Sequence, residues 1–379
     1  MRILFLTNHL KANDGWSRYS LDLAEGLKAE DNEVLCLVEK IDKNVEIKQK
    51  KVFEDPLDYL ANPFKSFLAS LKTKKEIKKF KPDVIHFIAE PYATILPFLN
   101  TKKARTVITV HGTYSTIPLL INNKIKKKLA RLVSSCYYKK ADKIISVSSF
   151  TKKHLINHFP DTKNKTEVVT NGINLDNFVL RPESNEDYNI NKNNKIKQIL
   201  FVGEVKNHKG LKEAIEALKI YKENYDNNFL FNIVGFYKEN DSYYRDLIKL
   251  IGIYNLKDNI VFYGRIKEEK LKELYHKADL FLMLSINTGK KFEGFGLVYL
   301  EANAYGVPCI GSVNSGAIDA ILNGENGFTV SPEKSFNIAK KIDLVLNKNK
   351  IKRKDCFSWA KNNSLKIKIN KILKHIYAT

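Results

Sequence analysis

Short apolar runs alternate with longer amphipathic segments along most of the chain. Residues 3–7 and 34–38 are mainly apolar, which is typical of strands buried on both faces. Between them, residues 19–28 place Leu21, Leu23, Ala24 and Leu27 near one face, which predicts a helix. Further strands are expected at 83–87, 106–110, 143–147 and 167–169. The alternation predicts an α/β fold, with a parallel sheet covered by helices on both faces.

A polar segment divides this pattern into two parts of similar architecture. Residues 181–197, RPESNEDYNINKNNKIK, are typical of a linker or domain boundary. Strands are then expected again at 199–202, 230–234, 260–263, 280–284 and 308–310. We therefore expect two Rossmann-like, doubly wound domains that face each other across a cleft, with the first domain at 1–180.

Composition narrows the class of protein. The 379 residues are 44% hydrophobic, which is typical of a globular protein. The four cysteines are scattered without a C-x-x-C pair, which favours neither a disulfide framework nor a zinc ribbon and fits a reduced, cytoplasmic setting. The first apolar run is too short for a signal peptide, and no run is long enough for a membrane helix.

The formal charge of +22 allows several interpretations. A basic excess favours binding to nucleic acid, to an anionic membrane surface or to anionic substrates. It equally fits a Lys- and Asn-rich composition with solvated faces. Because the basic residues are dispersed and no known nucleic-acid module is present, we expect no nucleic-acid partner.

Two glutamates with a glycine turn form the sharpest motif in the chain. Glu293 and Glu301 are eight positions apart, and Gly294 and Gly296 follow the first glutamate at the expected start of a helix. Backbone N–H groups at a helix N-terminus suit an anion or a hydroxyl, and glycine allows close approach. Glu301 lies in an otherwise apolar helix, where a carboxylate needs a partner such as a ribose diol. An ordinary helix start with an acidic first turn is the alternative interpretation.

Residues 293–310 closely resemble the E-x7-E motif of the retaining family-4 glycosyltransferases, which have the GT-B fold. Segments that agree with this family in order lie at 82–87, 109–115, 141–155, 168–178, 199–218, 261–266, 277–285 and 357–367. The last of these resembles a C-terminal helix that crosses back to the first domain. The resemblance spans almost the whole chain, and it implies a donor-binding domain at 181–355 and a returning helix at 356–379.

The resemblance also implies roles for residues of the second domain. Glu301 is expected to hold the nucleotide ribose and Glu293 a hydroxyl of the donor sugar. The backbone of residues 294–296, Gly-Phe-Gly with Phe295 at its centre, is expected at the sugar and the distal phosphate. Lys209 is expected to neutralise the diphosphate and stabilise the leaving group.

Further roles are implied at other loops. His111 is expected to line the sugar site, and Gly15 to lie near the diphosphate and the acceptor. Ser315 and Gly316 belong to a loop of small residues expected to approach the phosphates.

One position departs from the family in a way that affects the expected phosphate site. Glu204 stands where the family usually has an arginine, and a carboxylate cannot bind a phosphate. Lys206, His208 and Arg265 are candidates to replace that cation, and the sequence does not choose between them.

The resemblance implies a hexosyltransferase that uses a UDP- or GDP-linked sugar and retains the anomeric configuration. A glycan or lipid-linked acceptor in envelope polysaccharide synthesis is expected. The chain has no D-x-D triplet, so we expect neither a metal nor a cofactor. A sugar-nucleotide epimerase or hydrolase on the same fold is the alternative, and it differs in needing no acceptor.

Two basic segments of the first domain, 65–81 and 124–132, suggest a membrane contact, and the second has the clearer pattern. Ile125, Leu129 and Leu132 recur at helical spacing among basic residues, which predicts an amphipathic helix able to lie on an anionic surface. The basic residues are Lys124, Lys126, Lys127, Lys128 and Arg131. We expect a cytoplasmic protein, peripheral at the inner face of the membrane. The alternative is that the apolar face of this helix packs on the domain core.

Overall fold

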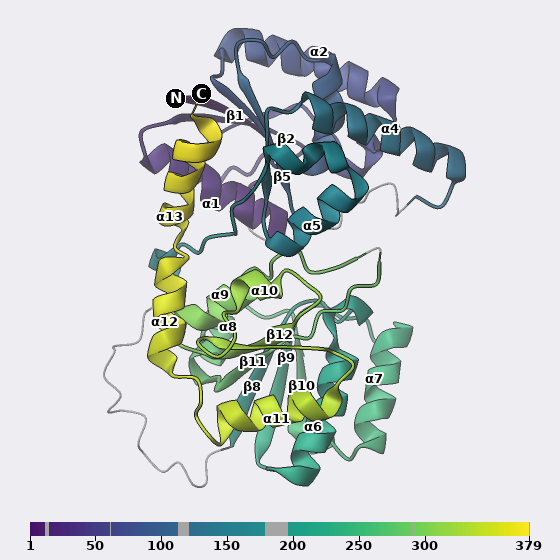
Figure 1. Ribbon diagram of the computed structural model, residues 1–379, viewed down its shortest axis with the longest axis vertical. Helices are drawn as coiled ribbons and strands as arrows, with labels where there is room; N and C mark the ends of the chain where they lie inside the picture. Colours follow the sequence, from purple (N-terminus) through teal and green to yellow (C-terminus); the bar gives the residue numbers. More distant parts are fainter. Residues whose placement is uncertain (12–14, 61, 113–120, 179–195, 290, 379) are drawn as a thin grey trace. The chain divides into compact units, whose positions relative to one another are not determined.

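The computed structural model describes residues 1–11, 15–60, 62–112, 121–178, 196–289 and 291–378. The described residues form two compact units. Unit 1 comprises Met1–Gly172 with Leu365–Thr379, and unit 2 comprises Ile173–Ser364. Each unit is built around one parallel sheet with helices on its faces (Figure 1).

Unit 1 has a seven-stranded sheet in the order β3-β2-β1-β4-β5-β6-β7. Its strands are β1 (Arg2–Leu6), β2 (Glu33–Val38), β3 (Lys48–Lys51), β4 (Val84–Phe87), β5 (Arg105–Val110), β6 (Lys143–Ser146) and β7 (Thr166–Val168). Its helices are α1 (Gly15–Ala29), α2 (Pro63–Phe80), α4 (Lys124–Lys140), α5 (Ser149–His158) and α13 (Leu365–Lys371), with 3₁₀ helices η1 (Pro56–Tyr59), η2 (Glu90–Phe98) and η4 (Pro160–Lys165) and the π-helix η9 (Ile372–Tyr377). The expected strands of this domain are all present.

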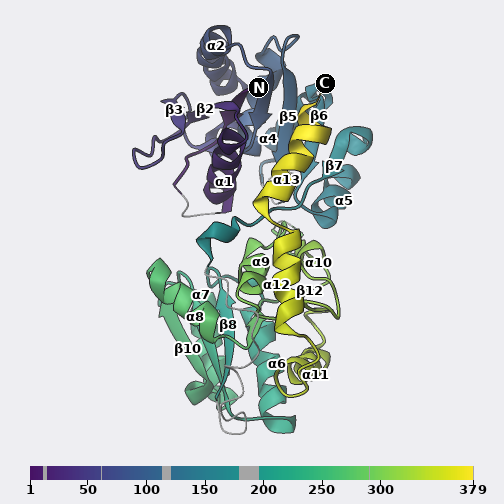
Figure 2. The ribbon, with the colours of Figure 1, turned by 90° about the vertical axis from the view of Figure 1, so that its left-hand side faces the viewer.

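Two apolar cores cover the two faces of the unit 1 sheet. Along β1, Leu4 and Leu6 point into one core, and Ile3 and Phe5 point into the other, because successive side chains of a strand alternate. The first core lies under α2, η2, α4 and α5, and the second lies under α1 and the C-terminal helices. Figure 2 shows α13 beside α1, where the end of the chain returns to the unit.

Unit 2 has a six-stranded parallel sheet in the order β10-β9-β8-β11-β12-β13. Its strands are β8 (Lys197–Val202), β9 (Phe229–Val234), β10 (Ile260–Gly264), β11 (Leu280–Leu282), β12 (Cys309–Ser312) and β13 (Gly327–Val330). Its helices are α6 (Leu211–Asn224), α7 (Ser242–Ile253), α8 (Glu268–Lys277), α9 (Leu297–Ala304), α10 (Ala317–Ala320), α11 (Ser335–Leu346) and α12 (Arg353–Asn362), with 3₁₀ helices η5 (Leu175–Asn177), η7 (Asn207–Lys209) and η8 (Lys257–Asn259).

Both sheets follow the doubly wound strand order, in which the order reverses once. The reversal lies between β1 and β4 in unit 1 and between β8 and β11 in unit 2. Connections leave such a point in opposite directions, which opens a crevice beyond the carboxyl ends of the strands. The predicted doubly wound architecture is confirmed for each unit, and the cleft between them stays a prediction.

The return to unit 1 begins later than the expected residue 356. Helix α12 belongs to unit 2, because Cys356 and Ala360 are fully buried there and the Trp359 indole N–H donates to the Ala320 carbonyl at 2.8 Å. The chain rejoins unit 1 at Leu365. Most of the expected linker at 181–197 lies outside the described residues.

Candidate active site

Lys209 and Glu293 meet where the strand order of unit 2 reverses. Lys209 lies in η7, which follows β8, and Glu293 lies in the loop between β11 and α9. The Lys209 Nζ atom is 2.5 Å from Glu293 Oε2, and the two side chains are 22% and 16% exposed. The fold thus brings together a cation and a carboxylate from two loops, at the edge where open parallel sheets bind ligands.

Backbone contacts hold the two loops together beneath this pair. The Ile286 N–H donates to the His208 carbonyl at 2.9 Å. Gly210 is the N-cap of α6 with a φ of 72°, and a Cβ there would lie 1.8 Å from the Leu284 carbonyl oxygen. Since only glycine tolerates both the positive φ and this approach, Gly210 fixes the position of the preceding Lys209.

The charges of this cluster depend on one another. Burial favours the neutral form of Glu293, but the Lys209 charge and hydrogen bond outweigh burial and hold the pKa of this carboxyl below its ordinary value. Burial lowers the pKa of His208 to about 4, and the Lys209 charge adds to this effect. At neutral pH the cluster therefore contains the Glu293 carboxylate and a neutral His208 imidazole beside Lys209.

A glycine turn joins Glu293 to the start of α9. Gly296 is the N-cap of α9 with a φ of 84°. The Gly316 N–H donates to the Glu293 carbonyl at 2.8 Å, and a Cβ on Gly316 would lie 1.9 Å from the Gly294 carbonyl oxygen. The loop before α9 and the loop before α10 are therefore packed backbone to backbone, as a site for a closely bound ligand requires.

Two expected contact residues use their side chains inside the protein. The Phe295 side chain is buried in the core of unit 2. The Ser315 hydroxyl donates to the Ser312 carbonyl at 3.1 Å and accepts the Ala317 N–H at 3.2 Å. Both side chains therefore shape the turns, and a ligand contact through the backbone of these residues stays a prediction.

Glu301 is the fifth residue of α9, a little more than one turn beyond Gly296. It is half-buried, and its Oε2 atom accepts the Tyr275 hydroxyl at 3.0 Å. The Tyr275 ring stacks on Tyr305 with 5.3 Å between centroids. Sequence reasoning did not single out Tyr275, for which the sequence offers no signal beyond an aromatic residue in the last turn of a polar helix.

The three cations considered as replacements for the missing arginine have different surroundings. Lys206 pairs with Asp241, the N-cap of α7, at 3.1 Å. His208 is neutral at pH 7, as described above. The exposed Arg265 guanidinium lies 4.9 Å from the centre of the Phe236 ring. Glu204, beside them, is exposed.

In unit 1, His111 directly follows β5 at the carboxyl edge of the sheet. Its ring packs edge-on against Tyr19 of α1, with 4.8 Å between centroids, and Trp16 lies 6.4 Å away. Burial lowers the pKa of His111 to about 3. The buried Nε2 atom has no hydrogen-bond partner among the described residues.

A buried hydrogen-bond chain supports the same strand. His86 Nδ1 lies 2.6 Å from the Tyr377 hydroxyl of η9, and His86 Nε2 lies 2.7 Å from the Thr109 hydroxyl of β5. Burial, reinforced by His111, lowers the pKa of His86 to about 3. The C-terminal π-helix is thus linked to β5 two residues before His111, a connection that sequence reasoning missed.

A buried carboxyl completes the unit 1 edge. Glu90 begins η2 after β4, is fully buried, and accepts the His111 N–H through Oε2 at 3.2 Å. Burial raises the pKa of Glu90 well above its ordinary value, so this position favours the uncharged form of the carboxyl. Gly15, also expected near this edge, is the exposed first residue of α1, and a Cβ there meets no described atom within 4 Å.

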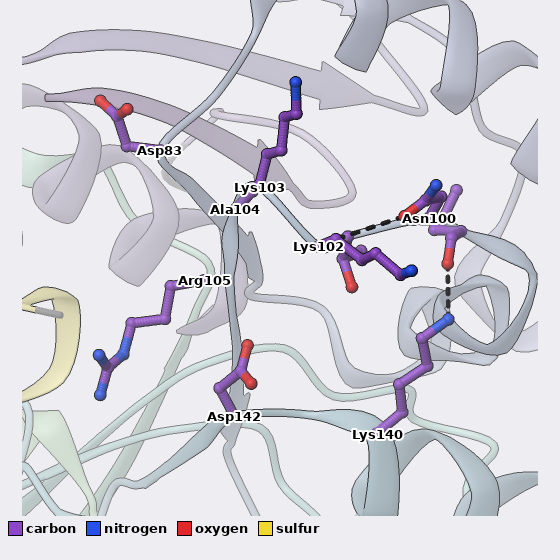
Figure 3. A pocket seen from close by; sticks show the side chains of 10 residues that line it. Asp83, Asn100, Lys102, Lys103, Ala104, Arg105, Lys140 and Asp142 are labelled. Atoms are coloured by element: carbon purple, nitrogen blue, oxygen red, sulfur yellow. Dashed lines mark hydrogen bonds between the residues drawn. The ribbon is translucent and has the colours of Figure 1, made fainter.

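A separate hollow of about 930 Å³ lies at the opposite, amino edge of the unit 1 sheet (Figure 3). Its carboxylates serve the chain itself: Asp142 accepts the Thr106 N–H at 2.7 Å, and Asp83 accepts the Arg2 N–H at 2.7 Å. The Lys140 ammonium donates to the Leu99 carbonyl at 2.5 Å. Because ligands of open parallel sheets bind at the carboxyl edge, this hollow is not the candidate site.

Among the described residues, no three His, Cys, Asp or Glu side chains gather so that they could hold a metal ion. No described helix is both long and apolar enough to cross a membrane.

Comparisons with known proteins agree with this geometry. Residues 13–177 match the model of Glycosyltransferase Family 4, and residues 182–363 match that of Glycosyl transferases group 1. The chain is 30% identical over 208 residues to an uncharacterised glycosyltransferase of Methanocaldococcus jannaschii, covering 54% of this chain and 50% of the relative. It is 29% identical over 211 residues to the capsular polysaccharide biosynthesis glycosyltransferase CapM of Staphylococcus aureus, covering 55% and 53%. The chain thus spans about half the length of these curated relatives.

A solved structure extends the match to the whole fold. A glycosyltransferase from Rickettsia africae superposes with a TM-score of 0.76 at 22% identity, covering 99% of this chain and 97% of the other. The two family models follow each other along nearly the entire chain, and each unit has the doubly wound sheet expected of a GT-B domain. The chain therefore belongs to the family-4, or group 1, glycosyltransferases and has the GT-B fold.

Proposed function

We propose that this chain transfers a hexose-type sugar from a UDP- or GDP-linked donor to a glycan or lipid-linked acceptor, with retention of configuration. The observation that carries the proposal is the Lys209–Glu293 pair, which lies beside the glycine turn of α9 at the switch point of unit 2. The similarity to a capsular polysaccharide enzyme supports a role in envelope polysaccharide synthesis.

In this proposal the ion pair changes partners when the donor binds. The donor diphosphate takes the place of Glu293 beside the Lys209 ammonium, and the released carboxylate accepts hydrogen bonds from the sugar. Backbone N–H groups of residues 294–296 and of the Gly316 loop face the distal phosphate. Glu301 holds the ribose hydroxyls, with Tyr275 keeping its carboxylate in place.

The chemical step breaks the bond between the anomeric carbon and the distal phosphate oxygen and forms a bond to the acceptor oxygen on the same face. The acceptor proton passes to the leaving phosphate. Lys209 stabilises the negative charge that develops on that phosphate. Since Glu293 is engaged with hydroxyl groups, the proposal includes no carboxylate nucleophile and no metal ion.

The edge of the unit 1 sheet at His111 is suited to binding the uncharged hydroxyl groups of a sugar. The buried Nε2 atom of His111 has no partner among the described residues, so it is available to a substrate hydroxyl. Its neighbours Tyr19 and Trp16 offer ring edges rather than charges. In the proposal His111 lines the sugar site, and Gly15 leaves room for the acceptor.

We also propose a peripheral position on the inner face of the membrane, through helix α4. The alternative that its apolar residues pack on the core is wrong, because Ile125 is 81% exposed, and Leu129 and Leu132 are exposed as well. Most of the basic residues around them are exposed too. Helix α4 therefore presents an amphipathic basic face to solvent, which suits an anionic lipid surface.

A single assay tests the reaction. The protein is incubated with UDP- and GDP-linked hexoses in EDTA, with and without a lipid-linked acceptor, and the products are followed by NMR of the anomeric proton. We expect an acceptor-dependent product with the donor's anomeric configuration. Free sugar or an isomeric donor formed without acceptor would instead identify a hydrolase or an epimerase, and loss of activity restored by Mn²⁺ would contradict the metal-free step.

A further inference from the structure

Helix α2 of unit 1 carries its apolar and polar residues on the opposite faces from those of an ordinary surface helix. Over its first three turns the inward face is made of small side chains, and Ser66, Ser70 and Thr73 are buried there, whereas Phe80 is buried at its end. Its outward face begins with four large apolar side chains. Phe64 is 70% exposed, and Phe67, Leu68 and Leu71 are between 42% and 47% exposed. A surface helix normally turns such residues toward the core.

Each buried hydroxyl group on the inward face of α2 has a hydrogen-bond partner. The Ser66 hydroxyl donates to Thr94 Oγ1 of η2 at 2.9 Å, and the Thr73 hydroxyl donates to the Ala69 carbonyl at 2.9 Å. The Ser70 hydroxyl donates to the Phe67 carbonyl at 2.6 Å. The Thr73 and Ser70 bonds lie within the helix, but the Ser66 bond joins α2 to η2. Rotating α2 to bury its phenylalanines would break the Ser66–Thr94 bond and expose the buried Phe80, so the fold favours the exposed apolar face.

The exposed face extends beyond the helix at one end and becomes basic at the other. Phe98, at the end of η2, lies 5.7 Å from the Phe67 ring centroid and is itself exposed. In the last turns of α2, Lys75 and Lys78 continue the stripe of Phe64, Leu68 and Leu71 at helical spacing. Exposed lysines flank that stripe at positions 72, 74 and 79. We call Phe64, Phe67, Leu68, Leu71 and Phe98 the α2 patch.

The combination of an apolar patch and a lysine row narrows the choice of occupant. A second copy of this chain could cover the apolar side chains, but with the same lysine row and a formal charge of +22 it brings no net negative charge to the lysines. An anionic bilayer accepts the apolar side chains at its acyl boundary and the ammonium groups at its headgroups. Helices α2 and α4 both pack on η2, over the same face of the sheet.

We infer that the α2 patch inserts into the surface of an anionic lipid bilayer, while the lysines that follow it bind lipid headgroups. The inference rests on the membrane part of the proposed function, and it names a second element that penetrates the bilayer in addition to α4. Sugar transfer itself does not depend on it.

Insertion is tested with the full chain and vesicles of phosphatidylglycerol and phosphatidylcholine. The variant Phe64→Ser, Phe67→Ser, Leu68→Ser, Leu71→Ser removes the four residues of the patch that lie on α2, all at exposed positions. We expect its partition onto anionic vesicles to fall at least about tenfold. The matched control Ile248→Ser, Ile253→Ser, Phe336→Ser removes exposed apolar residues from unit 2, and we expect it to bind vesicles as the wild type does.

A fluorescent reporter separates insertion from other contacts. Phe64→Trp should be quenched by bromine on the lipid acyl chains, whereas Phe336→Trp should not be. Wild-type partition by the four-serine variant, or equal quenching of the two reporters, would overturn the inference. So would a dimer in light scattering that the four-serine variant converts to a monomer, because the patch would then bind a second copy.

The result is kept apart from the proposed function by two further measurements. Thermal stabilisation by nucleoside diphosphates, which reports on unit 2, should be the same in all these variants. A variant with Lys124, Lys126, Lys127 and Lys128 changed to serine tests α4 alone. Suppose that this lysine variant of α4 loses vesicle binding, whereas the variant with serine at positions 64, 67, 68 and 71 binds fully. That result would retain the α4 contact and reject the α2 patch.

Discussion

The two units share one sheet topology but present opposite electrostatics at the edges where it reverses. In unit 2 the edge carries a charged pair, Lys209 and Glu293, of which the carboxyl has a lowered pKa. In unit 1 burial at the corresponding edge favours the uncharged forms of both titratable groups. The pKa of His111 is lowered to about 3, and burial raises the pKa of Glu90 well above its ordinary value.

The physical cause of the difference is pairing. Glu293 and Glu90 are both buried, but Glu293 has an ammonium partner, whereas Glu90 accepts a backbone N–H from His111. A buried carboxyl without a cation becomes protonated, and one with a cation stays ionised. In the proposed function this difference assigns the ligands: the diphosphate binds beside the Lys209 cation of unit 2, and uncharged hydroxyl groups bind at the edge of unit 1.

The largest effect is expected from removing the cation of the unit 2 pair. Lys209→Ala should lower kcat about 10²- to 10³-fold, because the developing phosphate charge loses its partner, while donor affinity changes less. Steady-state kinetics and calorimetry with the nucleoside diphosphate separate the two quantities. Lys212→Ala is the matched control, since this exposed lysine of α6 pairs with Glu216 and has no role in the proposed site. A Lys209→Ala enzyme with wild-type kcat would assign the role to another cation.

A second effect, on binding rather than turnover, is expected from Glu301. Glu301→Ala removes charge-assisted hydrogen bonds to the ribose and should weaken nucleotide affinity about 10- to 100-fold. Tyr275→Phe removes one hydrogen bond to this carboxylate but leaves its charge, so we expect a smaller loss. Calorimetry with UDP and GDP measures both. Equal affinity of the folded Glu301→Ala variant and the wild type would reject the ribose role.

A third effect tests the neutrality of the unit 1 edge through the pH dependence of stability. His86 is ordinarily half-protonated near pH 6.5 but in the fold only near pH 3, so the unfolded chain binds an extra proton between these values. Stability must then fall as the pH is lowered through this window, by at most about 1.4 kcal/mol per pH unit. His86→Gln keeps a neutral hydrogen-bonding side chain. From pH 7 to pH 5 we expect this variant to lose up to about 2 kcal/mol less than the wild type.

Urea unfolding at the two pH values measures this difference. Thr151→Val is a control that removes a buried hydroxyl of unit 1 without changing a titratable group. If the stability of the wild type and that of His86→Gln depended on pH in the same way, the fold would not lower the pKa of His86.

The strands could largely be predicted from the sequence, and the exceptions have a physical reason. Strand β3 reads KQKK, which lacks any apolar pattern because it is an edge strand whose lysines reach solvent. Strand β13 reads GFTV and was missed because it is short and begins with a glycine. The local signal fails where a strand does not contribute to both faces of a core.

Site residues could be predicted where they lie close together in the sequence, and not where the fold brings distant residues together. Glu293 and Glu301 could be found because they lie in one continuous motif with a helix start. The chain from Tyr377 through His86 to Thr109 could not, because His86 and Tyr377 are 291 positions apart and each looks like an ordinary apolar-segment residue. The raised pKa of Glu90 likewise depends on burial by distant segments rather than on its neighbours in sequence.

The smallest effect concerns Glu204, which makes the charge of the unit 2 edge less positive than the family pattern. It directly follows Gly203, whose Cβ position would lie 4.0 Å from Lys209 Cδ, so the backbone at this point is adjacent to the expected phosphate cation. Because Glu204 is exposed, water screens its charge, and one unit charge at a few ångströms is worth about 1 kcal/mol there. Glu204→Arg should therefore tighten nucleoside diphosphate binding by about 3- to 10-fold. Glu204→Gln, which removes the negative charge without adding a cation, should give the smaller part of that gain.

Calorimetry at low and high salt tests whether the gain is electrostatic, because an electrostatic gain in affinity should shrink with added salt. Unchanged affinity in both variants would place position 204 outside the reach of the diphosphate, and Arg265 would then be the next cation to test.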